Sequence, residues 1–182
     1  DEELPLHHWR QTKFDDIAAY LMRTDAIHGD GYFIIGEEKD REALWKRLLD
    51  TGLVVADAAA FDYLRIEAGL PRFGQELTGE YIPLEANLWD DVSFKKGCYT
   101  GQEIIARMES RGQLAKKLVK LRPAAAVTAG DPLSANGKNA GVITSVAVGP
   151  AGPIGMGYVK TAGLEAGTPL FVGETAGAVN LT

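Results

Sequence analysis

The stretch that says most about the fold of this 182-residue chain spans residues 96–103 and reads Lys96-Gly97-Cys98-Tyr99-Thr100-Gly101-Gln102-Glu103. Its second half has the T-x-x-E form of a capping box, in which the Thr100 hydroxyl and the Glu103 carboxylate each accept a hydrogen bond from the other residue's backbone N–H. Tyr99 and Ile104 occupy the two positions of a hydrophobic staple around that cap. The pattern therefore predicts a helix that begins here and ends near Gly112.

Cys98 lies two residues before the predicted cap, in a loop that faces the positive end of the helix dipole. Lys95 and Lys96 add cationic charge, and helix N-termini and neighbouring cations both favour the thiolate form of a cysteine. This position makes Cys98 a candidate reactive thiol. Residue chemistry alone favours the simpler interpretation, in which Cys98 is a small buried hydrophobic side chain, because free cysteine is among the most buried residue types.

Upstream of the motif, the sequence mixes helix and strand signals. Two apolar runs, at residues 17–22 and 32–35, flank the turn-rich segment 28–31 and predict a pair of strands. Apolar residues at four-residue spacing then predict a helix from about Asp40, with Gly52 as its stop. A second helix is expected from Asp57, which can cap it, to Gly69.

Downstream of Pro123 the composition changes, because glycines become frequent, charged residues thin out, and Val, Ile and Thr gather in short runs. The runs at residues 141–148, 154–159 and 170–172 have the even spacing of a small β-barrel or sandwich. We therefore divide the chain into residues 1–122 and residues 123–182.

The overall composition argues against several classes of protein. A net charge of −6 lacks the broad basic field of a nucleic-acid-binding protein. No run approaches the 18 or so apolar residues that cross a membrane, and the first residues do not form a signal peptide, so we expect a soluble, cytoplasmic protein. One cysteine and three scattered histidines form no recognisable zinc site, so we predict no bound metal.

The motif and its surroundings resemble a known family. Residues 96–103 match the K-G-C-Y-x-G-Q-E signature of folate-binding YgfZ-type proteins, a branch of the family that contains the glycine-cleavage aminomethyltransferase. Residues 64–77 resemble that family's R-x-E-A-G-x-P-x-x-G-x-E-L stretch, and residues 141–145 and 155–159 resemble its carboxy-terminal barrel. The similarity extends over essentially the whole chain.

The resemblance implies an α+β fold, namely a partial aminomethyltransferase-like folate-binding region followed by a small carboxy-terminal β-barrel. The family fold is a ring of three domains around an opening that holds tetrahydrofolate. We expect the chain to lack the family's amino-terminal domain, including the acidic residue that the aminomethyltransferase uses in catalysis.

The resemblance also implies a function and a site. We expect a tetrahydrofolate-binding accessory protein for iron–sulfur cluster assembly or repair, which acts through Cys98 with Lys96 beside it. Its partners would be folate and iron–sulfur proteins or their assembly machinery, without nucleic acid or membrane. Arg65, Tyr99 and Gln102 are the residues expected to contact folate, although a surface or interdomain salt bridge is an equal alternative for Arg65.

The alternative is a tetrahydrofolate-dependent aminomethyltransferase. Two substitutions oppose it, because Phe33 and Phe61 align with a glutamate and an arginine that hold the pterin in the enzyme branch. A phenylalanine ring can stack on a pterin but cannot pair with its donor and acceptor edge. The simplest interpretation of both rings is that they belong to the hydrophobic core. A third possibility is a folate sensor that needs no thiol.

Overall fold

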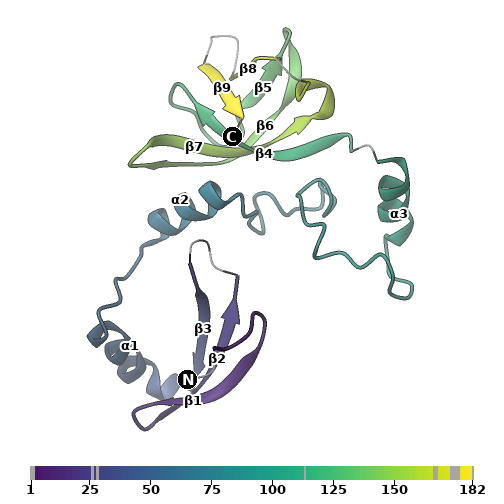
Figure 1. Cartoon of the computed structure of the whole chain (residues 1–182). Helices are drawn as coiled ribbons and strands as arrows, with labels where there is room; N and C mark the ends of the chain where they lie inside the picture. Colours follow the sequence, from purple (N-terminus) through teal and green to yellow (C-terminus); the bar gives the residue numbers. More distant parts are fainter. Residues whose placement is uncertain are drawn as a thin grey trace. The chain divides into compact units, whose positions relative to one another are not determined.

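A computed structural model describes residues 3–25, 27, 29–112, 114–165, 168–172 and 177–181. The chain divides into two compact units, residues 1–58 and 59–182, which are described separately (Figure 1). His28, part of the predicted turn, lies outside the described residues. Within the described residues, none of the helices is long and apolar enough to cross a membrane.

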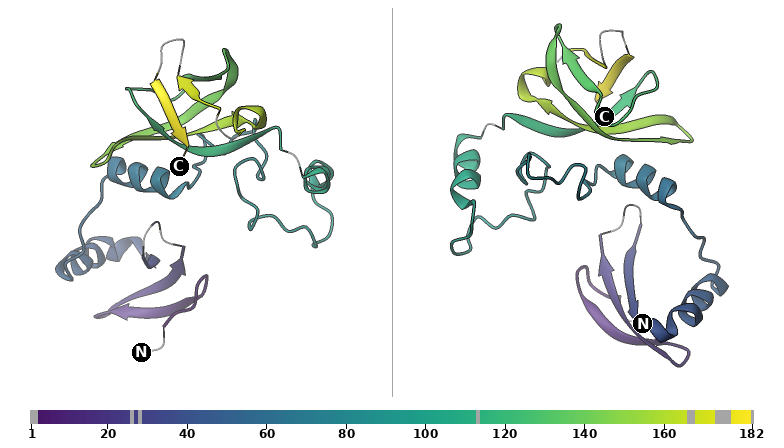
Figure 2. Two further views of the ribbon diagram at one scale, coloured as in Figure 1. Left: turned by 45° about the horizontal axis from the view of Figure 1, so that its top comes forward. Right: turned by 180° about the vertical axis from the view of Figure 1, so that it is seen from behind.

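The first unit is built on an antiparallel sheet with strand order β1-β2-β3 (Figure 2). Its strands are β1 (Trp9–Phe14), β2 (Ile17–Thr24) and β3 (Gly31–Gly36). The β2–β3 pair confirms the predicted strand pair. β1 was not predicted, because Trp9-Arg10-Gln11-Thr12-Lys13-Phe14 contains no apolar run and most of it is exposed.

The helix predicted near Asp40 is present in this unit. A short 3-10 turn, η1 (Glu38–Asp40), leads into α1 (Arg41–Asp50), and Gly52 follows with a φ of 90°. Only glycine adopts such a φ readily, which explains why the helix stops there. Leu44 is buried and lies close to Gly36, where a Cβ would meet the Leu44 side chain at 3.2 Å.

The second unit begins with two helices joined by a long irregular segment. α2 (Ala58–Ala68) ends at Gly69, whose φ is 75°, as predicted. α3 (Gln102–Arg111) confirms the helix expected after the central motif. Ile66 of α2 packs with Ala86 of the irregular segment and with Leu118, Met156 and Tyr158, so α2 and the strands share one hydrophobic cluster.

The rest of the second unit is a closed antiparallel barrel with strand order β4-β7-β6-β5-β8-β9, which confirms the predicted barrel. The strands are β4 (Lys116–Pro123), β5 (Pro132–Ala135), β6 (Lys138–Gly149), β7 (Gly152–Lys160), β8 (Leu170–Val172) and β9 (Gly177–Leu181), with η2 (Thr161–Gly163) after β7. The first barrel strand, β4, ends where we expected the barrel region to begin.

Glycines in the barrel allow close packing of the strands. A Cβ added at Gly157 would lie 2.5 Å from the Val142 carbonyl oxygen, so a larger residue does not fit without a shift.

The neighbouring Tyr158 is buried and stacks on Tyr81 with ring centroids 3.5 Å apart. Lys116 extends over the Tyr81 ring, with its Nζ 4.3 Å from the centroid. Strands and irregular segment therefore form one packed body.

Candidate functional site

The central motif forms an exposed loop that leads into α3. Cys98 is exposed, as are Lys96 and Gly97 on its amino-terminal side. The interpretation of Cys98 as a buried hydrophobic residue is therefore wrong. An exposed thiol can meet a second protein or a small molecule, which a thiol in the core cannot do.

Lys96 is held within this loop by the ring of Tyr99. Its Nζ lies 5.2 Å from the Tyr99 centroid, which is within the range of a cation–π contact. Its backbone N–H donates to the Ser93 hydroxyl over 3.2 Å. Tyr99 is half-buried and packs against the cluster of Leu84, Ile105 and Leu114. The cation two residues from Cys98 is thus attached to a ring that the core holds in place.

The start of α3 differs from the predicted capping box. The first helical acceptor is the Gly101 carbonyl, which receives the N–H groups of Ile104 and Ile105 at 3.1 and 3.3 Å. The Glu103 carboxylate accepts from Arg107 over 3.2 Å, one turn along the helix. The capping residue has a φ of 89°, which glycine adopts readily and threonine does not. Gly101 therefore caps the helix in place of Thr100.

The predicted hydrophobic staple is also absent, because Ile104 is 53% exposed while Tyr99 packs against Leu84, Ile105 and Leu114. Gln102 is half-buried, and its backbone N–H donates to the Tyr99 carbonyl over 3.2 Å. The structure therefore brings Tyr99 and Gln102 together in one turn beside Cys98. Their expected contact with folate stays a prediction.

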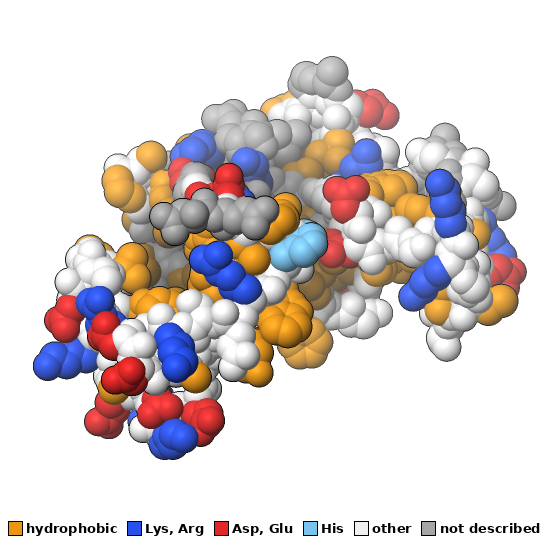
Figure 3. Space-filling view, turned by 60° about the horizontal axis from the view of Figure 1, so that its bottom comes forward, with side chains coloured by type: hydrophobic (Ala, Val, Ile, Leu, Met, Phe, Trp, Pro, Cys, Tyr) orange, Lys and Arg blue, Asp and Glu red, His pale blue; other side chains and the backbone are white. Residues whose placement is uncertain are grey.

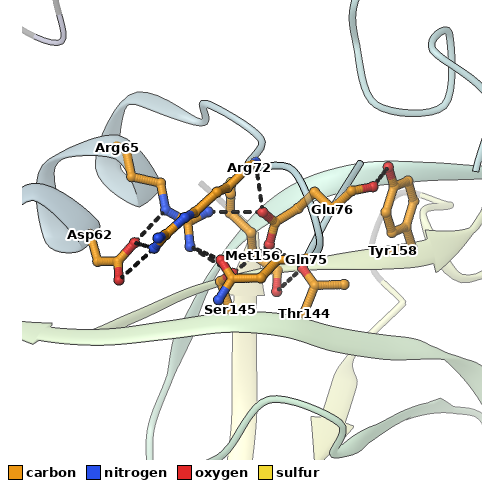
Figure 4. Close-up of polar contacts among 9 residues, drawn as sticks. All are labelled: Asp62, Arg65, Arg72, Gln75, Glu76, Thr144, Ser145, Met156 and Tyr158. Carbon is orange, nitrogen blue, oxygen red and sulfur yellow. Dashed lines mark hydrogen bonds and ion pairs between the residues drawn. The ribbon is translucent and has the colours of Figure 1, made fainter. Parts of the chain in front are cut away.

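Arg65, the third residue expected to contact folate, lies in a buried polar network (Figure 4). Its Nε donates to Asp62, its Nη1 to Glu76 and its Nη2 to both Gln75 and Ser145, over 2.7–3.0 Å. Only 3% of the Arg65 surface is exposed. All three guanidinium nitrogens therefore bind protein groups, and Arg65 does not fit the role of a folate ligand.

Glu76 is the acceptor at the centre of this network and is fully buried. Its carboxylate accepts from the Arg65 guanidinium at 2.9 Å, the Arg72 backbone N–H at 3.0 Å and the hydroxyls of Thr144 and Ser145 on β6 (Figure 4). A buried carboxylate is tolerated only with such partners. The network joins α2 and the segment after it to the barrel.

The network could have been found only partly from the sequence. Arg65, Glu76, Thr144 and Ser145 all lie in stretches that resemble motifs of the family, but nothing in their spacing indicates that they meet. Arg65 and Ser145 are 80 positions apart in the chain. Their contact depends on the position of the barrel against α2, which local patterns do not reveal.

The two phenylalanines aligned with pterin anchors are not core residues. Phe33 on β3 is 57% exposed and Phe61 on α2 is 52% exposed, so the interpretation of either ring as core is wrong. The two rings belong to different compact units. Each is available to a ligand or partner as an apolar ring.

The described residues offer no ready-made metal centre, since no three His, Cys, Asp or Glu side chains among them are grouped to hold an ion. Tyr158 is a buried titratable residue of the second unit, and its hydroxyl donates to the Glu76 carbonyl over 3.0 Å. Burial raises the pKa of this phenol far above its ordinary value. Tyr158 is therefore a neutral structural hydroxyl.

The chain matches two family models, the GCVT N-terminal domain over residues 1–96 and the glycine cleavage T-protein C-terminal barrel domain over residues 116–181. An aminomethyltransferase of Rubrobacter xylanophilus is 35% identical over 82% of this chain and 41% of its own length. A chloroplastic protein of Arabidopsis thaliana, named as an unproven transferase, is 32% identical over 88% of this chain and 38% of its own length.

A crystal structure of the glycine cleavage system aminomethyltransferase T from Bartonella henselae is similar to this chain with a TM-score of 0.78 and 30% sequence identity. The match covers 90% of this chain and 48% of that one. The chain thus spans less than half the length of these relatives.

Proposed function

Because the chain belongs to the glycine-cleavage T-protein family, we propose that it is a tetrahydrofolate-binding accessory protein for iron–sulfur cluster assembly or repair. The observation that carries this proposal is the exposure of Cys98 within the K-G-C-Y-T-G-Q-E loop. The loop presents one thiol and one tethered cation on the surface, where a partner protein can contact both.

The chemistry open to Cys98 requires only a thiolate. The Cys98 sulfur could attack the outer sulfur of a partner's persulfide, forming a new S–S bond while the partner's thiolate leaves. It could also contact a partner's cluster as a ligand, because the thiolate is the form that binds iron. Lys96, two residues away in the sequence, has its Nζ over the Tyr99 ring and adds a positive charge to the same loop.

The folate part of the proposal rests on family membership and on rings rather than on Arg65. Phe61 offers an exposed ring on α2 that could stack on a pterin. It cannot donate or accept the hydrogen bonds that a charged residue there would supply. We therefore propose that folate is a bound ligand and assign it no one-carbon transfer step.

The competing candidate is an aminomethyltransferase, because several relatives at 29–36% identity carry that name. Phe33 and Phe61 oppose it, because both replace anchors that resemblance assigns to the enzyme. An assay with tetrahydrofolate and an aminomethyl-carrying lipoyl protein separates the two functions. Formation of methylene-tetrahydrofolate at rates above an enzyme-free control would support the transferase and contradict the accessory role.

The accessory role is tested in cells that lack the protein and depend on a cluster-containing radical enzyme. Cys98→Ser should reduce that enzyme's activity to the level of the deletion, whereas Thr100→Ser, an exposed position in the same loop, should restore it. Immunoblots confirm equal amounts of both variants. Full activity with Cys98→Ser would exclude the thiol from the function, and folate calorimetry on that variant would then test the sensor alternative.

A further inference from the structure

We draw no further inference here: the strongest candidate, the face of the β1-β2-β3 sheet that carries the exposed rings of Trp9, Tyr20 and Phe33, is one of the open apolar surfaces of the molecule (Figure 3), and nothing in the described structure shows what covers it.

Discussion

The buried pair of Arg65 and Glu76 makes the sharpest prediction about how the second unit holds together. Arg65→Met removes the guanidinium that donates to the fully buried Glu76 carboxylate over 2.9 Å. Breaking a buried ion pair on one side costs about 3–5 kcal/mol, because the other charge stays buried without its partner. The exposed ion pair of Arg72 with Asp62 supplies the control, since Arg72→Met should cost about 1 kcal/mol or less.

The measurement is amide hydrogen exchange of the β6 and β7 strands, which reports the free energy of unfolding of the second unit alone. A double variant, Arg65→Met with Glu76→Leu, should recover much of the loss, because an apolar pair of similar volume can replace a buried ion pair. A loss below about 1 kcal/mol for Arg65→Met, or no recovery in the double variant, would refute the role assigned to this pair.

Three further predictions concern other parts of the chain. Burial raises the pKa of Tyr158, so its phenol ionises at a lower pH in the unfolded protein than in the folded protein. Above about pH 10 the stability of the second unit should therefore fall by up to about 1.4 kcal/mol per pH unit, and Tyr158→Phe should weaken this dependence of stability on pH. Phe61→Ala should weaken tetrahydrofolate binding in calorimetry about tenfold, whereas Phe73→Ala, an 88% exposed ring, should not; equal affinities would contradict stacking on Phe61. Gly157→Ala should destabilise the barrel by about 1–3 kcal/mol in urea unfolding, while Gly79→Ala, with open space around it, should have little effect; equal costs would contradict the close strand packing.

The elements with a strong local signal were predictable from the sequence. The stop of α1 at Gly52 and of α2 at Gly69 follows from glycines with positive φ, and the barrel follows from short β-branched runs between glycines. β1 was missed because four consecutive polar residues, 10–13, separate its two aromatic residues, Trp9 and Phe14, and most of the strand is exposed. A strand held mainly by pairing with β2 leaves little trace in its own sequence.

The candidate site was predictable in its residues more than in its geometry. The motif identified Cys98 and Lys96, but exposure of the thiol is decided by how the loop leaves the cluster around Leu84. The capping box was a reasonable prediction from Thr100 and Glu103, yet the positive φ of the intervening Gly101 moved the cap by one residue. Contacts such as those of Arg65 depend on distant segments, and local patterns carry no information about them.

The most direct test of the central claim is repair of a damaged cluster enzyme in a purified system. A radical enzyme whose cluster has been damaged by oxygen is incubated with iron, a persulfide donor, a reductant that converts persulfide sulfur to sulfide, and the protein carrying either Cys98 or serine at that position. Wild-type protein and Thr100→Ser should restore enzyme activity, and Cys98→Ser should leave it at the level seen without the protein. Equal recovery with Cys98→Ser would contradict the proposal that this exposed thiol supports iron–sulfur enzymes.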